Sequence, residues 1–347
     1  TYLNHYYLIS LIALLLAVTP CDRALALRSS SSGEEGGGTV PRWAYVLLRC
    51  QVGLVYFFAG FAKLDADWLV RAEPLRTWLQ AYAHWPVVGP LLDSDLAAYG
   101  MSAFGALFDL TIWAWLLWRR SRPVAYAVAV VFHVAIWLLF PVGVFSWVML
   151  AAATIFFAPN WPRRWLRSPV GSRSPELHPE AATSGVRLGL ISAYVAVQVL
   201  VPLRYLAYPG PVNWTEEGFR FAWRVMLVEK AGSVEYRVTT ESPRSDRRVY
   251  PQQELAPFQY RAMATQPDLI RQYAVFIRER LEAEGNCGVH VYADAFVALN
   301  GRPSARLVDP AADLGAARGS LTTATWVLPP PWSVDELSKA SRPVGLH

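Results

Sequence analysis

The stretch WAYVLLRCQVGLVYFFAGFA, residues 43–62, decides the fold, because it is almost entirely apolar over its whole length. About 20 apolar residues form one helical crossing of a bilayer, so this stretch predicts a transmembrane helix. Comparable apolar runs are Tyr7–Pro20, Gly100–Trp118, Val124–Ala158 and Leu188–Leu206. The run at 124–158 is too long for one crossing, and Pro141 and Gly143 near its middle predict two helices joined by a bend. About six crossings are therefore expected.

Composition supports the bilayer as the solvent for much of the chain. Of 347 residues, 54% are hydrophobic and only 17% are charged, and the mean hydropathy is +0.23. These values exclude a purely soluble, nucleic-acid-binding or disordered protein. The net charge of +5 does not indicate an anionic partner, because the basic residues cluster at the ends of apolar runs, where they orient spans.

Arginines predict the orientation of these helices. Basic clusters follow the third and the fifth predicted crossings: Arg119, Arg120 and Arg122, and then Arg163, Arg164, Arg167 and Arg173. Loops rich in Lys and Arg face the cytoplasm, which places the loop Ser29–Gly38 inside as well. Lys63, the segment Asp65–Tyr99, Asn4 and His5 are then expected at the outer face.

The composition becomes polar and charged after Tyr208. Alternating stretches at Val234–Thr239 and Val289–Val297 predict strands, and Leu269–Leu281 has a helical pattern. We therefore expect a polytopic all-α transmembrane bundle, residues 1–207, followed by a small extracytoplasmic α+β domain, residues 208–347. Thr1 already lies inside an apolar segment, so we expect the amino-terminal part of the bundle to be missing.

Lys63 is the first candidate for chemistry. Among 32 basic residues only Lys63, Lys230 and Lys339 are lysines, and Lys63 directly follows the apolar VYFFAGFA. One interpretation is a lysine that extends its ammonium to the headgroups. The other is a general base, because a lysine in an apolar pocket can lose its proton. Arginine, which this chain otherwise prefers, cannot be deprotonated, and this favours the base modestly.

Other polar residues in or near the spans have two interpretations each. Asn4 and His5 open the first crossing beside tyrosines, as interfacial anchors do. Arg49, Asp109 and His133 lie within apolar runs, where ionisable groups are functional candidates but also serve as polar support between helices. Polar support is the interpretation we prefer for these three, and Arg49 is a plausible partner for a carboxylate.

Metal, disulfide and nucleotide chemistry have no support in the sequence. Cys21, Cys50 and Cys287 are too few and too scattered for a zinc site or a disulfide framework. No phosphate-binding, dinucleotide, zinc-protease or serine-hydrolase motif is present. The many aromatic residues would instead give an intramembrane pocket flat apolar walls, which suit a planar ligand such as a quinone.

Ordered motifs along the chain resemble one family. The core of the resemblance is AGFAKLDADW within residues 46–69. It is accompanied by NHYY near the start, FHVAIWLLFPVGVFSWVMLA at 132–151, APNWPRRW at 158–165, NWTEEGFRFAWRVML at 213–227, VYADAFVALNGRP, LVDPAADL and TWVLPP. These motifs resemble those of the vitamin K-dependent gamma-glutamyl carboxylases, whose membrane part is the horizontally transferred transmembrane (HTTM) domain.

The resemblance implies a lyase-type carboxylase in the membrane with epoxidase activity. In that family a base deprotonates reduced vitamin K, oxygen adds, and the resulting strong base removes the γ-proton of a peptide glutamate, which captures CO2. Phylloquinone or menaquinone hydroquinone would be the cofactor, with O2 and CO2 as co-substrates and no metal. The family's catalytic lysine matches Lys63, and its Asn-His pair matches Asn4 and His5, which would stabilise the carbanion or the carboxylation transition state.

The segment associated with glutamate recognition departs from the family. It corresponds to Phe219, Phe221, Trp223, Arg224 and Met226, where animal members have tyrosines and an acidic residue. Arg224 would favour an acidic substrate by charge pairing, or indicate a different substrate. Two alternatives therefore stay open: a quinol epoxidase without carboxylation to gamma-carboxyglutamate, and a non-catalytic quinone-binding, lipid-binding or transport protein. The expected partners are the bilayer, here a bacterial plasma membrane, and a glutamate-containing peptide.

Overall fold

The computed structural model describes residues 3–19, 40–158, 161, 185–317, 319 and 323–332. The chain divides into two compact units, of which the first comprises residues 1–62 and 104–202. The second comprises residues 63–103 and 203–347. The predicted loop at 29–38, Cys21 and the arginines at 163–173 lie outside the described residues.

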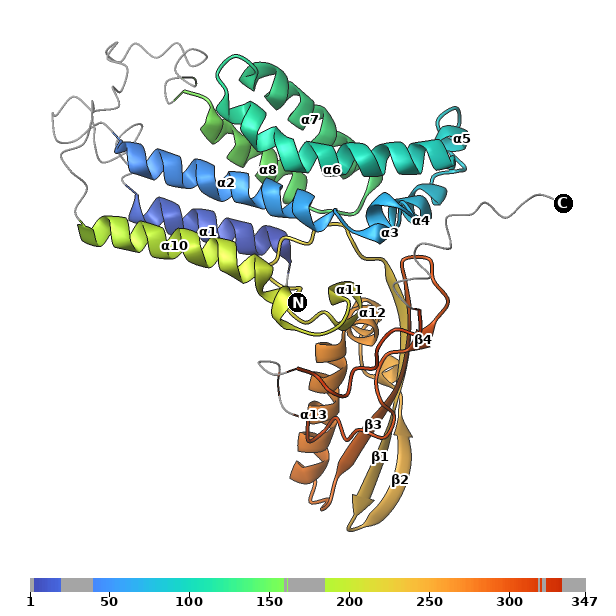
Figure 1. The fold of residues 1–347 in the computed structure, drawn as a ribbon. Helices are drawn as coiled ribbons and strands as arrows, with labels where there is room; N and C mark the ends of the chain where they lie inside the picture. The colour runs from blue at the N-terminus through green and yellow to red at the C-terminus, as the bar shows by residue number, and fades with distance from the viewer. Residues whose placement is uncertain are drawn as a thin grey trace. The chain divides into compact units, whose positions relative to one another are not determined.

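The first unit is helical. Its elements are α1 (Asn4–Val18), α2 (Arg42–Ala62), the main part of α6 (Asp95–Leu117), α7 (Arg122–Leu139), α8 (Phe145–Ala153), η3 (Thr154–Phe156) and α10 (Gly185–Leu203). α7 packs against α8, and α1 contacts both α2 and α8 (Figure 1). The predicted division of the run at 124–158 is confirmed, because α7 ends at Leu139 and α8 begins at Phe145. Gly143, with a φ of 59°, lies in the connection.

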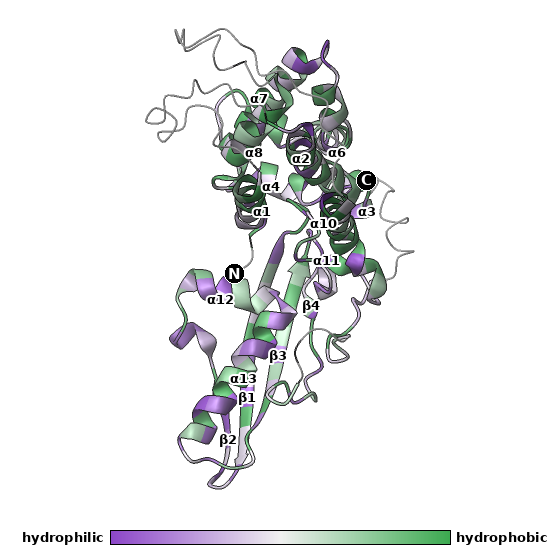
Figure 2. Cartoon of the chain, turned by 90° about the vertical axis from the view of Figure 1, so that its left-hand side faces the viewer, coloured by the Kyte–Doolittle hydropathy of each residue, from purple (hydrophilic) through white to green (hydrophobic). Residues whose placement is uncertain are grey.

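Four helices among the described residues are long and apolar enough to cross a membrane. They are α2, α6, α7 and the segment Gly185–Ala207, which joins α10 to η4 (Arg204–Ala207). α1 and the segment Phe145–Phe156 are apolar but shorter. Figure 2 shows these helices as largely hydrophobic. The expected helical membrane bundle is therefore confirmed, while six crossings and their orientation stay predictions.

Helices α2 and α6 approach each other closely at Gly60. A Cβ added to Gly60 would lie 2.5 Å from the backbone nitrogen of Leu110 and 2.9 Å from the carbonyl carbon of Asp109. Small residues allow helices to approach in membranes, where packing replaces the hydrophobic effect as the driving force. Gly60 is therefore a packing residue of this unit.

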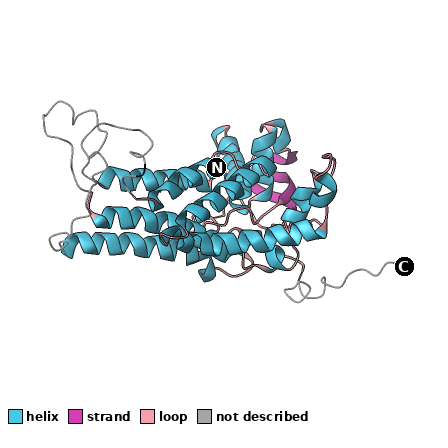
Figure 3. Cartoon of the chain, turned by 90° about the horizontal axis from the view of Figure 1, so that it is seen from above, coloured by secondary structure: helices cyan, strands magenta, loops and turns pink. Residues whose placement is uncertain are grey.

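The second unit contains a four-stranded antiparallel sheet with the order β2-β1-β3-β4. Its strands are β1 (Lys230–Glu241), β2 (Arg244–Val249), β3 (His290–Leu299) and β4 (Ala305–Arg306). β1 pairs with β3 along its length, from Lys230 opposite Leu299 to Thr239 opposite His290. Figure 3 shows the strands close together, in magenta. The expected small α+β domain is therefore confirmed.

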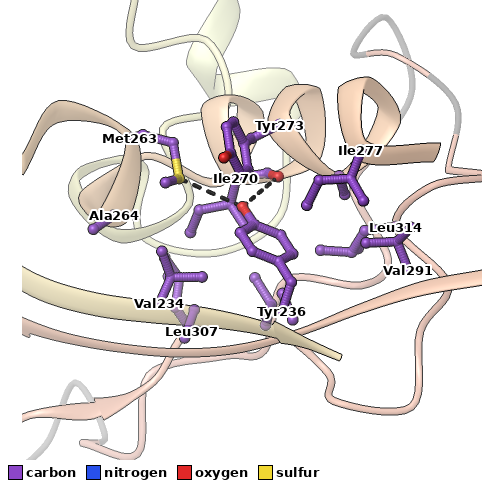
Figure 4. Close-up of a cluster of buried hydrophobic side chains, with 14 of the residues drawn as sticks. Val234, Tyr236, Met263, Ala264, Ile270, Tyr273, Ile277, Val291, Leu307 and Leu314 are labelled. Atoms are coloured by element: carbon purple, nitrogen blue, oxygen red, sulfur yellow. Dashed lines mark hydrogen bonds between the residues drawn. The ribbon is translucent and has the colours of Figure 1, made fainter. Parts of the chain in front are cut away.

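Two helices cover one face of this sheet, α12 (Pro257–Thr265) over β1 and α13 (Pro267–Ala283) over β3. Alternate residues of β1 and β3 are buried, as expected for strands with one covered face. Tyr236 lies at the centre of the core, fully buried, and its hydroxyl donates a hydrogen bond to the carbonyl of Ile270 at 2.8 Å (Figure 4). The buried hydroxyl is thereby satisfied, as the apolar surroundings require.

Residues 63–103 also belong to the second unit. They form the short helices α3 (Ala66–Leu69), α4 (Leu75–Gln80) and α5 (Gly89–Leu92) and the first part of α6. The remaining short elements of the unit are α11 (Val212–Thr215) and η5 (Pro251–Gln253). The segment that directly follows the span α2 therefore folds together with the sheet domain, and it begins with Lys63.

Gly60→Ala tests the close packing of α2 and α6. The added methyl group would meet the backbone of Asp109 and Leu110 as well as the Leu110 side chain, and the backbone cannot move aside easily, so we expect a loss of about 1–3 kcal/mol in the free energy of unfolding. The matched control is Gly53→Ala on the same helix, where a Cβ would meet only the Trp113 Cβ at 3.8 Å. Denaturant unfolding in detergent should show a loss for Gly60→Ala alone, and equal stability of both variants would contradict the packing.

Candidate functional site

Lys63 is a buried amine in the second unit. The residue is 4% exposed, so it does not extend its ammonium into open surroundings as a snorkelling lysine does. Its Nζ lies 3.5 Å from the carbonyl oxygen of Val225, to which it donates a hydrogen bond. The same nitrogen lies 5.1 Å from the centre of the Trp68 ring. A carbonyl acceptor and an aromatic face therefore lie beside the amine.

The turn after α2 fixes this arrangement on one side. α2 ends at Ala62, and Asp65 caps α3, because its side chain accepts a hydrogen bond from the backbone nitrogen of Asp67 at 2.9 Å. Trp68 donates its ring hydrogen to the carbonyl of Ser102 at 2.8 Å, and the Ser102 hydroxyl donates to the carbonyl of Trp68. The indole under Lys63 is therefore held by α3 and by the start of α6.

The segment that carries Val225 has an unusual backbone. Four of its residues other than glycine have a positive φ: Glu216, Phe221, Trp223 and Met226. Left-handed conformations of bulky residues are rare and cost of order 1–3 kcal/mol each unless the surroundings hold them in place. Gly218 is required here, because a Cβ would lie 2.5 Å from the Cα of Tyr205. Such strain clusters at functional sites, and three of the predicted glutamate-recognition residues are among the four.

Arg224 is a buried cation in the same segment. The residue is 5% exposed, its Nε donates to the side-chain oxygen of Asn213 at 3.2 Å, and its guanidinium carbon lies 5.2 Å from the centre of the Tyr205 ring. A nitrogen of the guanidinium lies 3.9 Å from a carboxylate oxygen of Asp65. Burial lowers the pKa of Arg224 and raises the pKa of Asp65. The pair links the recognition segment to the turn that follows Lys63.

The other predicted recognition residues have different environments. Trp223 is fully buried, so it supports the segment from within. Phe219 and Met226 are half-buried. Phe221 lies under the guanidinium of Arg204, whose carbon is 5.6 Å from the ring centre. Trp223 therefore has a structural position, whereas Phe221 borders open space.

A cavity of about 520 Å³ opens beside Phe221 in the second unit. Its walls include three arginines, Arg204, Arg220 and Arg271, together with Asp268 and Trp326. Asp268 forms ion pairs with both Arg220, at 3.2 Å, and Arg271, at 3.3 Å. The walls also carry the carboxylates of Glu216, Glu217 and Asp313, so the cavity combines aromatic surface with both cationic and acidic groups. Arg204 is the arginine of the three that does not pair with Asp268.

Asn4 and His5 lie in the first unit. Asn4 is the first residue of α1, and the ring of His5 packs on that of Tyr6 with a centroid distance of 4.5 Å. Both residues are half-buried. Lys63 belongs to the second unit, so the sharing of one site by these three residues stays a prediction.

The three intramembrane polar candidates have defined positions in the first unit. The Nε2 of His133 lies 2.9 Å from the hydroxyl of Tyr56, which joins α7 to α2. Arg49 donates to backbone carbonyls at the end of η3, at 3.0 Å to Ile155 and 2.6 Å to Phe156, where helix carbonyls have no partner within the helix. Asp109 is buried in α6. The Arg49 guanidinium therefore binds the carbonyls that are left without partners at the end of a helix. The sequence did not indicate these carbonyls as its partners.

Three further residues, Asp67, Asn300 and Arg302, lie around the turn that follows α2. The sequence alone gave none of them a role. Asp67 is bound by Arg302 through two hydrogen bonds, one of them 2.8 Å long, and by the amide of Asn300 at 3.0 Å. All three residues are buried. All three lie in the quoted motifs KLDADW and LNGRP, so the motifs indicated these positions. The hydrophobic pattern of the sequence did not indicate that Asp67 contacts residues more than 230 positions away.

Among the described residues, no group of three or more His, Cys, Asp or Glu side chains is placed to bind a metal ion. Cys50 and Cys287 are free thiols.

Comparison with known families agrees with this architecture. Residues 1–161 match a family described as the HTTM domain. Residues 183–332 match a family described as the vitamin K-dependent gamma-carboxylase, lumenal domain. No solved structure gives a significant match to the chain.

A helical membrane unit that matches the HTTM domain, followed by an α+β unit that matches the lumenal domain, is the architecture of a gamma-carboxylase-like membrane protein. Both family matches fall on these parts in the same order and together cover most of the chain. The chain belongs to the vitamin K-dependent gamma-carboxylase family.

Replacement of Asp67 or Arg302 tests the buried ion pair. Asp67→Leu or Arg302→Met alone leaves a buried charge without its partner, which should lower the free energy of unfolding by about 3–5 kcal/mol. The double variant removes both charges and should lose clearly less than the sum of the single variants. Denaturant unfolding of the four proteins measures the coupling, and strictly additive losses would show that the pair is not coupled.

Proposed function

We propose that the protein oxygenates a reduced naphthoquinone, vitamin K hydroquinone, to its epoxide and couples this reaction to CO2 addition at the γ-carbon of a peptide glutamate. Membership of the gamma-carboxylase family supports the reaction class. The observation that carries the proposal is the buried amine of Lys63, held between the Val225 carbonyl and the Trp68 ring. In this proposal Lys63 is the general base and faces the outer side of the membrane.

The environment of Lys63 fits this role. A general base must reach the proton that it removes and works best where bulk water is excluded. Lys63 is 4% exposed and lies at the end of the apolar helix α2. The Trp68 ring beside its amine offers a flat apolar surface against which a planar quinol can stack. Lys63 would accept the proton of a quinol hydroxyl at its Nζ.

When bound, the reduced quinone would supply, together with O2, the strong base that the γ-proton requires. The residues of the chain would bind and orient the quinol and the peptide glutamate. Asn4 and His5 are proposed to stabilise the negative charge that develops on the glutamate, by hydrogen bonding to the carbanion or to the carboxylation transition state. Arg224, which directly precedes Val225, holds the Val225 segment to the turn after α2 through its contact with Asp65.

The peptide substrate is proposed to enter through the cavity beside Phe221. Glutamate peptides are acidic, and Arg204 at the cavity wall presents an exposed guanidinium above the Phe221 ring. Charge pairing of this guanidinium with a carboxylate of the peptide would orient the peptide without taking part in the chemistry.

Lys63 variants test the central role. Purified full-length protein in detergent is incubated with reduced vitamin K, O2, labelled bicarbonate and a glutamate peptide. Lys63→Ala should lower epoxide formation and label incorporation by about 10²–10⁴-fold. Lys63→Arg should be equally inactive, because a guanidinium keeps its proton.

Lys230→Arg is the matched control. Lys230 forms an ion pair with Glu216 at 2.7 Å, which a guanidinium can maintain, so its activity should stay close to that of the unmodified protein. Full epoxide formation by Lys63→Ala would refute the role of Lys63. Epoxide without label in the unmodified protein would support the oxygenase alternative, and neither product from folded protein would support a non-catalytic binder.

Arg204→Gln tests the peptide entrance. We expect an increase of about fivefold or more in the KM for the peptide, which corresponds to about 1 kcal/mol of lost charge-assisted binding. The rate at saturating peptide should change little. Arg247→Gln on the exposed edge strand β2 removes the same charge away from the cavity and should leave the KM unchanged. An equal KM in both variants and in the parent protein would exclude Arg204 from peptide binding.

A further inference from the structure

Asn300 occupies a constrained position at the end of β3. The residue is fully buried and its backbone has a φ of 49°. Asn is one of the few residues that adopt this left-handed conformation readily. Its side chain is directed back into the second unit, where a buried amide needs partners for both its donors and its acceptor.

The Asn300 amide makes three hydrogen bonds that connect separate segments. Its nitrogen donates to a carboxylate oxygen of Asp67 at 3.0 Å and to the carbonyl oxygen of Leu227 at 3.1 Å. Its oxygen accepts from the backbone nitrogen of Glu229 at 2.8 Å. One side chain therefore ties α3 to the segment that leads from the recognition residues into β1.

These two segments carry the groups that contact Lys63. Trp68, whose ring lies below the amine, follows Asp67 directly. Val225, whose carbonyl accepts from the amine, precedes Leu227 by two residues. The hydrogen bonds of Asn300 thus connect the segment that carries the aromatic face to the segment that carries the carbonyl, and both groups lie beside the Lys63 amine.

Arg302 reinforces the same link. Both of its terminal nitrogens donate to the Asp67 carboxylate, and its guanidinium carbon lies 5.1 Å from the centre of the Trp332 ring. With the Arg302 guanidinium and the Asn300 amide both bound, the Asp67 carboxylate is fixed in position and orientation. Buried networks of this kind specify geometry when every member is satisfied.

We propose that Asn300, supported by Arg302, is the positioning residue that sets the geometry of the Lys63 amine. This inference rests on the proposed function, in which Lys63 is the general base. Asn300 does not touch the substrate. It keeps the Val225 carbonyl and the Trp68 ring at fixed positions relative to each other. A displacement of about 1 Å at a reacting group is enough to lower a rate about 100-fold.

Asn300→Asp is the sharpest variant, because it preserves shape, the left-handed backbone and the acceptor for the Glu229 nitrogen. It replaces only the donor, so that a carboxylate oxygen faces the Asp67 carboxylate and the Leu227 carbonyl. The expected result is a fall of about 10- to 100-fold in the kcat for epoxide formation. The KM for the quinol should change less than the kcat, because stacking on the Trp68 ring tolerates a small displacement that proton transfer does not.

Asn286→Asp is the matched control. Asn286 donates through the same side-chain nitrogen to the carbonyl of Leu281 at 2.9 Å, in the same unit. It precedes β3, whereas Asn300 follows it, so the two positions are separated by roughly 30 Å of strand. The control carries the same charge change and should keep its kcat.

Denaturant unfolding of Asn300→Asp separates positioning from general damage to the fold. The proposal predicts a lowered kcat in protein that still unfolds in one cooperative transition. If Asn300→Asp does not fold, Asn300→Gly serves in its place, because glycine keeps the left-handed backbone and loses only the side chain.

Amine labelling tests the geometry without turnover. Trace reaction with an acylating reagent, read by mass spectrometry, gives the ratio of labelling at Lys63 to that at Lys230 in each protein. The proposal predicts a change of about threefold or more in Asn300→Asp, and none in Asn286→Asp. An unchanged labelling ratio together with an unchanged kcat would overturn it.

The same experiment separates this inference from the proposed function. If Lys63→Ala keeps its epoxide formation, the proposed function fails. The labelling ratio then still reports whether Asn300 positions the amine. If Lys63→Ala is inactive and Asn300→Asp changes neither the ratio nor the kcat, only the positioning role fails.

Discussion

The buried contact of Asp67 with Asn300 and Arg302 is the interaction on which the arrangement around Lys63 depends. It joins the turn directly after α2 to the end of β3, two parts separated by more than 230 residues. A carboxylate can be buried there only because two cationic or amide donors saturate it. The consequence is that residues 63–103 fold with the sheet domain, and that a lysine following a membrane span is enclosed by protein.

Enclosure changes the chemistry open to a lysine. An exposed ammonium at a helix end anchors the helix at the headgroups, whereas the Lys63 amine contacts a backbone carbonyl and an indole face. The strained backbone of the segment at 216–226 fits the same account, because left-handed bulky residues persist only where surrounding contacts hold them. Both features suit a preorganised site in the gamma-carboxylase family, and neither is needed to keep a helix in a bilayer.

Much of this could be predicted from the sequence, for clear physical reasons. Apolar runs predicted the helices, and Pro141 with Gly143 predicted the division of α7 from α8, because length and backbone chemistry are local properties. Lys63 was recognisable as the one lysine beside a span. The partners of Arg49 were not predictable, since backbone carbonyls carry no sequence signal, and the same holds for the Val225 carbonyl. Nor could pattern analysis join Asp67 to Asn300, because periodicity reports faces of single elements and not contacts between distant ones.

Anaerobic mixing of the protein with the quinol tests the central claim, that Lys63 removes the quinol proton, most directly. Without O2 the reaction stops after deprotonation, and the quinolate is detected by its absorption spectrum in a stopped-flow experiment. The account predicts rapid quinolate formation in the unmodified protein and in Lys230→Arg, and its loss in Lys63→Ala and Lys63→Arg. Quinolate formation at an unchanged rate in folded Lys63→Ala would contradict the account.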